Sequence, residues 1–463
     1  MRILFAAAAA TLLAACASQP AKSGSTPASP TSSKPYSFID DPYPSTYQRI
    51  PSPPVLITNA TVLDGTGRRL DGAGVLMRDG KIVAVGTTID VPADAIRVDG
   101  TGKWVTPGII DIHSHLGVYA SPGVSANSDG NEATAPVTAQ VWAEHSIWPQ
   151  DPGFLTALAG GVTAMQVLPG SANLIGGRGV TLKNIPAITY QAKKFPGAPW
   201  GLKMACGENP KRVYGQKGGP STRMGNVAGY RAAFAEAAEY MKKRKGGDTG
   251  KRDLKNDTLA GAINGDIRVH IHCYRADEMT TMIDLAKEFG FKISAFHHGV
   301  EAYKIADRLA AEGICGALWA DWWGFKMESF DGIQENILMV DRPQSGCAIV
   351  HSDSEEGIQR LNQEAAKVMA NGRRIGIDIA PERAIRWITA NPAKAMGIDG
   401  MTGTLEAGKM ADVVMWNGNP FSSYAQAEQV YIDGARLYDR RDPQRQPKSD
   451  FMLGQDVMQG GAR

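Results

Sequence analysis

The sequence predicts an α/β fold, a (β/α)8 TIM barrel with a small β-sandwich domain built from both ends of the chain. Between residues 107 and 399, eight short apolar segments alternate with segments of helical periodicity, and eight strands are what such a barrel requires. Short strand-like segments lie on either side of this region, at 51–106 and 400–440. The 463 residues suffice for one large domain and a smaller one.

The first residues do not belong to this fold. Residues 1–16 contain a basic residue, an apolar run too short to span a bilayer, and the stretch Leu-Ala-Ala-Cys, which together predict an export signal. The stretch resembles a bacterial lipobox, so Cys16 is predicted to be lipidated, and the Ala17 that follows it favours an outer-membrane anchor. An ordinary cleaved signal peptide is the alternative. Either interpretation places the protein outside the cytoplasm, in the cell envelope or periplasm.

Two further segments lie outside the predicted domains. Residues 17–50 are dominated by Ser, Pro, Thr, Ala and Gly, which predicts a disordered tether, and residues 441–463 are predicted to be a C-terminal tail. The chain as a whole has 43% hydrophobic and 21% charged residues, which is typical of a globular protein. Its formal net charge of +2 gives no support for a nucleic-acid partner.

The predicted small domain combines two distant parts of the chain. Asp79-Gly80 separates two alternating runs at 74–78 and 81–86, which is a strong signal for a β-hairpin. Residues 403–416 and 429–434 also have the pattern of short strands with turns. Each small sheet needs something to pack on, so the two parts are predicted to pack together.

The barrel elements follow in order along residues 107–399. The predicted strands are 109–115, 162–168, 180–183, 201–206, 267–272, 292–298, 316–319 and 347–353. The predicted helices are 151–159, 227–245, 276–289, 302–312, 355–371 and 381–388. The long segment 116–150 after the first strand is predicted to form a lid. Four cysteines show no paired spacing and are predicted to be buried small hydrophobes, with an oxidised pair left open by export: Cys206, Cys273, Cys315 and Cys347.

Two histidines end the first barrel strand. Alternate side chains of a strand share a face, so His113 and His115 are predicted to point the same way and to form half of a metal site. Chemistry in such barrels lies at the carboxyl ends of the strands. His270 and His272 share a face at the end of the fifth strand, with His272 nearer the mouth. A hydrogen-bonded core role remains the alternative for each histidine taken alone.

Other strand ends carry similar groups. Of the adjacent His297 and His298, alternation allows only one to face inward, and the eighth strand ends with Asp353. Lys203 lies within an apolar strand, where a cation is costly unless it is paired or modified. A surface position on a misplaced strand is the alternative for this lysine. Taken together, four strands are predicted to bring metal-compatible groups to one rim.

These motifs resemble those of the metal-dependent amidohydrolase superfamily, in its imidazolonepropionase-like and prolidase-like branch. The similarity extends over about residues 55–433 and is specific for the superfamily but not for a substrate. The stretches that carry it are 105–115, 270–278, 298–302, 352–353, 388–397 and 403–412.

The resemblance implies a metal centre and the residues that build it. It implies His113 and His115 as ligands of a first divalent ion, and His272 and His298 as ligands of a second. It further implies zinc as the ion, Asp353 as both ligand and general base, and a carbamylated Lys203 that bridges two ions. The implied reaction is hydrolysis of an amide-type C–N bond by a metal-activated hydroxide, whose proton Asp353 passes to the leaving nitrogen.

Alternatives remain open for the site and its substrate. Without carbamylation, one ion could be held by the other ligands, with His298 as a transition-state donor. A dipeptide or N-acyl amino acid is the favoured small-molecule substrate; cyclic amides, lactones or organophosphate esters are the alternative, and a non-catalytic metal-binding envelope protein is the second. The predicted substrate-binding residues are Lys211, Arg212, Tyr274 and Arg275. No membrane contact beyond the lipid anchor is predicted, and a homo-oligomer is left open.

Overall fold

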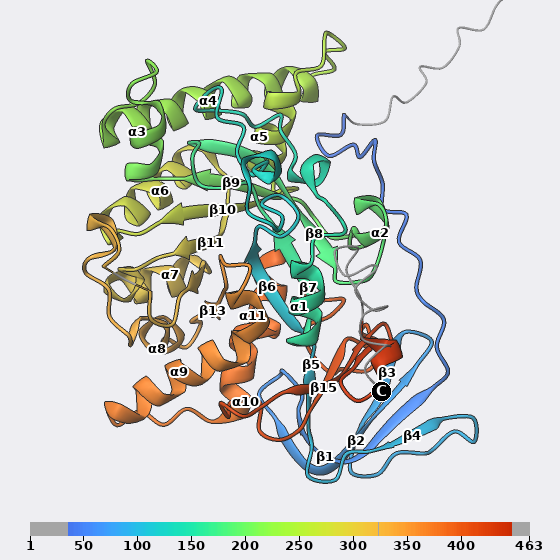
Figure 1. Ribbon diagram of the computed structural model, residues 1–463. Coiled ribbons are helices and arrows are strands. Elements are labelled where there is room, and N and C mark those ends of the chain that lie inside the picture. The colour runs from blue at the N-terminus through green and yellow to red at the C-terminus, as the bar shows by residue number, and fades with distance from the viewer. Residues whose placement is uncertain (1–35, 323, 447–463) are drawn as a thin grey trace, which may run out of the picture. The chain divides into compact units, whose positions relative to one another are not determined.

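The computed structural model describes residues 36–446 apart from residue 323 (Figure 1). The predicted export signal, Cys16 and most of the predicted C-terminal tail lie outside the described residues. Within the described part of the chain, no helix has the length and apolar character needed to cross a membrane.

Eight strands in sequence order form the barrel sheet, which confirms the predicted fold class. The last and first strands do not pair as a ladder, but the backbone N–H of Asp353, just after the last strand, donates to the carbonyl of His113 in the first at 3.0 Å. The strands are β6 (Ile109–Ser114), β7 (Val162–Val167), β8 (Ile175–Lys183), β9 (Gly201–Ala205), β10 (Arg268–Cys273), β11 (Ile293–His298), β12 (Cys315–Leu318) and β13 (Ala348–Val350).

One strand departs from an all-parallel barrel. β8 pairs antiparallel with both β7 and β9, whereas the other neighbouring strands pair in parallel. The chain between β7 and β8, residues 168–174, contains no helix, and a parallel crossover needs a dozen or more residues. The short connection therefore forces the chain to return antiparallel, and the expectation of a regular (β/α)8 repeat is wrong at this strand.

Helices surround the barrel sheet (Figure 1). Each predicted helical segment corresponds to helical structure, whereas α2, α3, α5, α8 and α11 were not predicted. In α6 the buried Met279, Met282, Ile283 and Ala286 follow helical spacing and form the face that packs on the barrel. The helices are α1 (Gly153–Ala159), α2 (Tyr190–Lys193), α3 (Glu208–Tyr214), α4 (Arg223–Lys245), α5 (Leu254–Asn264), α6 (Ala276–Phe289), α7 (Ala306–Glu312), α8 (Asn336–Asp341), α9 (Leu361–Arg374), α10 (Pro381–Ala384) and α11 (Ala390–Met396).

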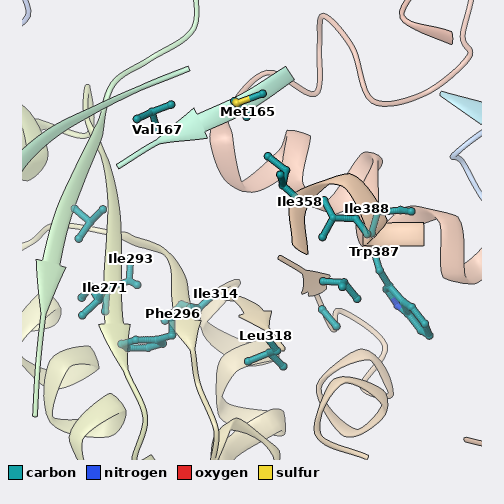
Figure 2. Packing of buried hydrophobic residues seen from close by; sticks show 14 of the residues in the cluster. Met165, Val167, Ile271, Ile293, Phe296, Ile314, Leu318, Ile358, Trp387 and Ile388 are labelled. Carbon is teal, nitrogen blue, oxygen red and sulfur yellow. The ribbon is translucent and has the colours of Figure 1, made fainter. Parts of the chain in front are cut away.

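The main apolar core lies between the barrel strands and these helices. Figure 2 shows Ile271 of β10 and Phe296 of β11 near one another, with Trp387 among the residues of the same cluster. A second cluster joins Ile110 and Ile112 of β6 to α11.

The small domain is built from both ends of the chain, as predicted. Its strands form one sheet that branches at β1, and β5 pairs antiparallel with β14 from the far end of the sequence. The predicted hairpin lies between β2 and β3, where Asp79 and Gly80 have φ of 52° and 78°. The strands are β1 (Val55–Leu63), β2 (Arg69–Arg78), β3 (Lys81–Gly86), β4 (Ile96–Asp99), β5 (Trp104–Pro107), β14 (Val413–Trp416), β15 (Ala427–Ile432) and β16 (Ala435–Asp439).

The last part of the predicted tether is packed on the folded body. Phe38 is buried, the Asp41 carboxylate lies 2.8 Å from the Lys194 Nζ, and the Ser45 hydroxyl donates to the Lys194 carbonyl at 2.6 Å. These contacts overturn the prediction of disorder for residues 37–50. The prediction from amino-acid composition was wrong here because a few side chains that contact the folded body are enough to hold an extended segment against it.

The four cysteines form two disulfides, Cys206–Cys273 and Cys315–Cys347. The prediction that favoured free buried thiols is therefore wrong. The pairs are 67 and 32 residues apart in sequence, yet neighbouring strands bring their Cα atoms to 5.2 and 4.6 Å. Cys206 comes directly after β9 and three residues after Lys203, and Cys273 ends β10 directly after His272.

A buried ion pair connects the barrel to the small domain and gives a testable prediction. The Lys183 Nζ of β8 lies 2.8 Å from Asp433 and 3.5 Å from Asp412, and all three side chains are buried. Lys183→Met would leave two buried carboxylates without their cation, so we expect a loss of about 3–5 kcal/mol in the free energy of unfolding, measured by urea denaturation. Lys103→Met, which breaks a partly exposed pair with Glu428, should cost about 1 kcal/mol or less. Equal costs would contradict this assignment.

Candidate active site

His113 and His115 lie at the end of β6 with their ring Nε2 atoms 3.3 Å apart. The Nδ1 of His115 donates to the Leu168 carbonyl at 2.8 Å, so Nε2 is the ring nitrogen that faces the cluster. Burial lowers the pKa of His113 well below its ordinary value, with the nearby charge of Lys203 acting in the same direction. The His113 ring is therefore neutral, the form in which imidazole binds a metal, and its Nε2 lies beside that of His115.

Asp353 follows β13 and faces the same two histidines. One carboxylate oxygen lies 3.2 Å from the His115 Nε2 and 3.4 Å from that of His113, and the other lies 3.8 Å from the His298 Nδ1. Burial opposes ionisation, but the hydrogen bond and charge of His115 outweigh it and hold the pKa of Asp353 below its usual range. With 24% of its side chain exposed, the carboxylate is both ionised and reachable from solvent.

The nitrogen and oxygen atoms at this rim can hold metal ions in two arrangements. One consists of His113, His115 and Asp353; the other consists of His113, His298 and His351. Sequence reasoning did not assign His351 as a ligand, although it is two residues before Asp353. Its place at the end of the predicted eighth strand, beside a predicted ligand, was a usable signal.

Unpartnered buried nitrogens support this fit to a metal. Among the described residues, the His272 Nδ1, the His298 Nδ1 and both ring nitrogens of His351 are buried and have no hydrogen-bond partner. Buried polar atoms without partners are costly, and a bound cation would satisfy those that face it. Burial lowers the pKa of His351 to about 4, so this ring is also neutral at physiological pH.

His297 and His298 both lie beside the His113 ring, each with its ring centroid 4.7 Å away. The prediction that only one of them faces inward is wrong. Strand alternation does not extend to His298 because its backbone is left-handed, with φ of 72°. Left-handed backbone in a non-glycine residue is uncommon and is concentrated at functional sites.

A chain of three histidines supports His113 from behind. The His113 Nδ1 lies 2.8 Å from the His297 Nδ1, and the His297 Nε2 lies 3.0 Å from the His270 Nδ1. With His113 donating through Nδ1, its Nε2 points to the ligand cluster. His270 therefore has a positioning role in the core instead of a place among the ligands.

Asp111 holds the ends of the first and last strands together. Its carboxylate accepts hydrogen bonds from the backbone N–H of His113 at 3.2 Å and from the backbone N–H and hydroxyl of Ser352. Burial raises the pKa of Asp111 to about 7, against the opposing effect of these hydrogen bonds. This carboxyl group was not predicted as a site residue, and its contacts position the backbone of His113 and of Ser352, the residue before Asp353.

Lys203 enters the cluster from β9. Its Nζ lies 3.4 Å from the His113 Nε2 and donates to the Pro169 carbonyl at 3.0 Å. The side chain is fully buried, and burial lowers the pKa of Lys203 to about 8, opposed by the charge of Asp353. A buried amine with a depressed pKa is a better nucleophile than an ordinary lysine.

His272 and Tyr274 lie at the rim on β10 and just after it. The rings of His272 and His298 are 4.7 Å apart, and the Tyr274 ring is 4.7 Å from that of His272. Asn209, at the start of α3, places its amide nitrogen 3.4 Å from the His272 Nε2. The structure thus brings all six predicted ligands to one rim, together with Tyr274.

The other predicted substrate-binding residues are placed differently. Arg275 makes two hydrogen bonds of 2.9 Å to Asp277 at the start of α6. Lys211 and Arg212 lie in the last turn of α3, where a loop was expected, and Arg212 is exposed. These positions give no direct contact with the ligand cluster among the described residues.

The predicted lid, residues 116–150, is packed against the barrel. Trp142 forms an isolated β-bridge with Arg178 of β8, and the Glu144 carboxylate lies 2.9 Å from the Lys194 Nζ. These contacts do not support a lid. The same segment places Tyr119 at the site, with its ring 5.5 Å from that of His115. A cavity of about 300 Å³ opens there, lined by Ser114, His115, Leu116, Tyr119, Asp353, Ser354 and Glu355.

Comparison with known proteins agrees with this site. Residues 351–438 match the sequence profile of the "Amidohydrolase family". An amidohydrolase of known crystal structure from Thermotoga maritima is 38% identical, with a TM-score of 0.77 over 83% of this chain and 100% of that chain. Amidohydrolase tasK of Hapsidospora irregularis is 31% identical over 83% of this chain, which spans 43% of that protein. Imidazolonepropionase of Mesorhizobium japonicum is 24% identical over 77% of this chain and 90% of its own length.

The matched profile includes His351 and Asp353, and the Thermotoga relative is covered along its whole length. The barrel and the histidine rim are the features on which these likenesses and the sequence motifs agree. The chain therefore belongs to the metal-dependent amidohydrolase superfamily and is a hydrolase that acts on carbon–nitrogen bonds.

Proposed function

We propose that this protein hydrolyses the amide bond of a dipeptide or an N-acyl amino acid at a site with two divalent ions, zinc being the proposed metal. The observation that carries the proposal is the convergence of Lys203 with His113, His115 and Asp353 at one buried rim. His113, His115, His272 and Asp353, three imidazoles and a carboxylate, would suit one ion alone. The buried lysine among them is what favours two.

The residues divide into two ligand groups. His113, His115 and Asp353 would hold the first ion, and His272 and His298 the second, with His351 close to the latter pair. When bound, such ions lower the pKa of water and polarise a scissile carbonyl. Leu168 and His297 keep the Nδ1 atoms of His115 and His113 engaged, so both rings present Nε2 to the cluster.

Asp353 is proposed as the general base. Its ionised carboxylate can accept a proton from the attacking water on one oxygen and then deliver that proton to the leaving nitrogen. Its contacts with His115 and His298 fix its orientation before the substrate binds. The left-handed backbone of Asp353, with φ of 53°, is the conformation that carries its side chain to the rim.

Lys203 is proposed to be carbamylated. The neutral amine attacks the carbon of carbon dioxide, an N–C bond forms, and the nitrogen loses a proton, which gives a carbamate anion. This converts a buried cation into an anion with two oxygens that can bridge two cations. The burial of Lys203 and its distance of 3.4 Å from the His113 Nε2 support the proposal.

We also propose that the protein is exported and held at the outer membrane through a lipid on Cys16. The two disulfides favour this location, because such bonds persist in oxidising compartments such as the periplasm. An assembly of identical subunits is compatible with this arrangement.

The experiment that tests the function is a substrate screen of the zinc-loaded protein. Dipeptides and N-acyl amino acids are expected to be hydrolysed faster than lactams, lactones or organophosphate esters, with release of a free amino acid measured by chromatography. Preferred turnover of a lactam or a lactone would replace the proposed substrate class. Turnover of no compound by fully loaded protein would reject it.

A further inference from the structure

The segment that follows β12 forms an aromatic wall over the second ligand pair. The Trp319 ring stacks on that of His298 at 4.3 Å, and its centroid is 6.1 Å from that of Tyr274. Trp322 and Phe325 continue this wall, with ring centroids 5.3 and 5.8 Å from Trp319. These two residues are 43% and 57% exposed, so the wall is open to a ligand.

Among the described residues, Lys326 projects onto this wall. Its Nζ lies 4.3 Å from the centre of the Tyr274 ring, within the range of a cation–π contact. The same Nζ donates to the Asn209 Oδ1 at 3.0 Å, and the Asn209 amide nitrogen lies 3.4 Å from the His272 Nε2. The ammonium group is therefore separated from a proposed metal ligand by one asparagine side chain.

The charge of Lys326 is only partly compensated. Its nearest carboxylate oxygen, on Glu208, is 3.6 Å away, which is too long for a hydrogen bond. Glu328 is instead bound by Arg223. With 20% of its side chain exposed, Lys326 keeps donor capacity that a ligand anion can use.

Neighbouring basic residues are engaged or distant. The Arg275 guanidinium is held by Asp277, and Arg223 is held by Glu278 and Glu328. Arg212 lies on the exposed face of α3. Lys326 is the cation that also contacts Tyr274 and Asn209, two side chains next to His272.

We propose that Lys326 binds the free carboxylate of the substrate and that Trp322 and Phe325 contact the apolar side chain next to it. This inference rests on the proposed function and narrows its substrate class. The substrate is a dipeptide or N-acyl amino acid with a free α-carboxylate and a bulky apolar C-terminal side chain. Lys326 is then a specificity-determining residue, which sequence reasoning had sought at Lys211 and Arg212.

The test compares a free acid with its amide. For alanyl-phenylalanine and alanyl-phenylalanine amide, Lys326→Met should lower kcat/KM on the acid on the order of 10- to 100-fold, mainly through KM, because one charge-assisted hydrogen bond is lost. The amide should be affected less than threefold, and Lys326→Arg should retain most of the preference for the acid. The control is Lys217→Met, which removes a lysine whose Nζ lies 5.8 Å from the centre of the Tyr214 ring. This variant should leave kcat/KM unchanged on both the acid and the amide.

A binding measurement separates this inference from the proposed reaction. Calorimetric titration of zinc-loaded protein with phenylalanine and with phenylalanine amide should show tighter binding of the acid, and Lys326→Met should abolish the difference. If the acid binds more tightly and Lys326→Met removes this preference, but no dipeptide is hydrolysed, the proposed reaction is wrong and the role of Lys326 in carboxylate binding is supported. Equal losses for acid and amide would mean that Lys326 only holds its loop in place, which would overturn the inference, as would equal affinities in the unmodified protein.

Discussion

Asp353→Asn is expected to lower kcat on the order of 1,000-fold while leaving the fold intact. The amide has nearly the same shape as the carboxylate but cannot accept the proton of the attacking water. Because only a quarter of the Asp353 side chain is exposed and it faces His115, no solvent base is placed to replace it. The measurement is kcat and KM on the substrate found in the screen, together with circular dichroism and the bound metal content.

The control for this variant is Asp307→Asn on the outer surface of α7, which makes the same chemical change away from the site. It should keep the activity of the unmodified protein. An Asp353→Asn protein that is folded, loaded with metal and still active within tenfold would rule out the general-base role. Loss of metal in parallel with activity would instead identify Asp353 as a ligand whose charge is needed to hold the ion.

Lys203→Met is expected to reduce bound zinc from about two ions per chain to about one and to lower activity at least 100-fold. The reason is the loss of the proposed bridging carbamate, the anion that would allow two cations to lie close together. Metal content is measured by plasma mass spectrometry after dialysis. The carbamate itself should give a carbon-13 resonance when the protein is loaded with metal in labelled bicarbonate.

Two further variants sharpen this result. Lys193→Met removes another buried lysine, whose Nζ donates to the Ile185 carbonyl at 2.6 Å outside the cluster, and should leave the metal content unchanged. Lys203→Ala makes room for a small carboxylate, so added acetate should restore part of the activity. One ion per chain in the unmodified protein, with Lys203→Met still active, would establish the mononuclear alternative.

Most of the ligand set could be predicted because two simple rules apply to it. Alternation along β6 places His113 and His115 together, and barrel topology brings the carboxyl ends of distant strands to one rim. Lys203 was recognisable because a cation in an apolar strand is costly and requires a reason. The inward direction of His297 escaped prediction because strand alternation fails at its neighbour. His298 leaves strand geometry through a positive φ, so His297 faces the site as well.

Other features depend on distances in space that no local pattern records. The pairing of Cys206 with Cys273 arises from neighbouring strands whose positions are set by the whole barrel. The antiparallel direction of β8 follows from a short connection, and the packing of residues 37–50 follows from a few anchors such as Phe38 and Asp41. Local composition describes neither contact, because both partners come from distant parts of the chain.

By itself, the sequence determined the barrel, the small domain built from both chain ends and the chemistry of the rim. These features follow from hydrophobic periodicity and from polar or charged residue types whose burial costs free energy unless they are paired or bind a ligand. Only the tertiary structure decided how the rim is supported and what lies above it. The contact of Asn209 with both His272 and Lys326 is the clearest example. Substrate-recognition residues lie on loops that follow different strands. These loops contact one another only when the barrel has packed, so the sequence of any one segment does not predict the contact.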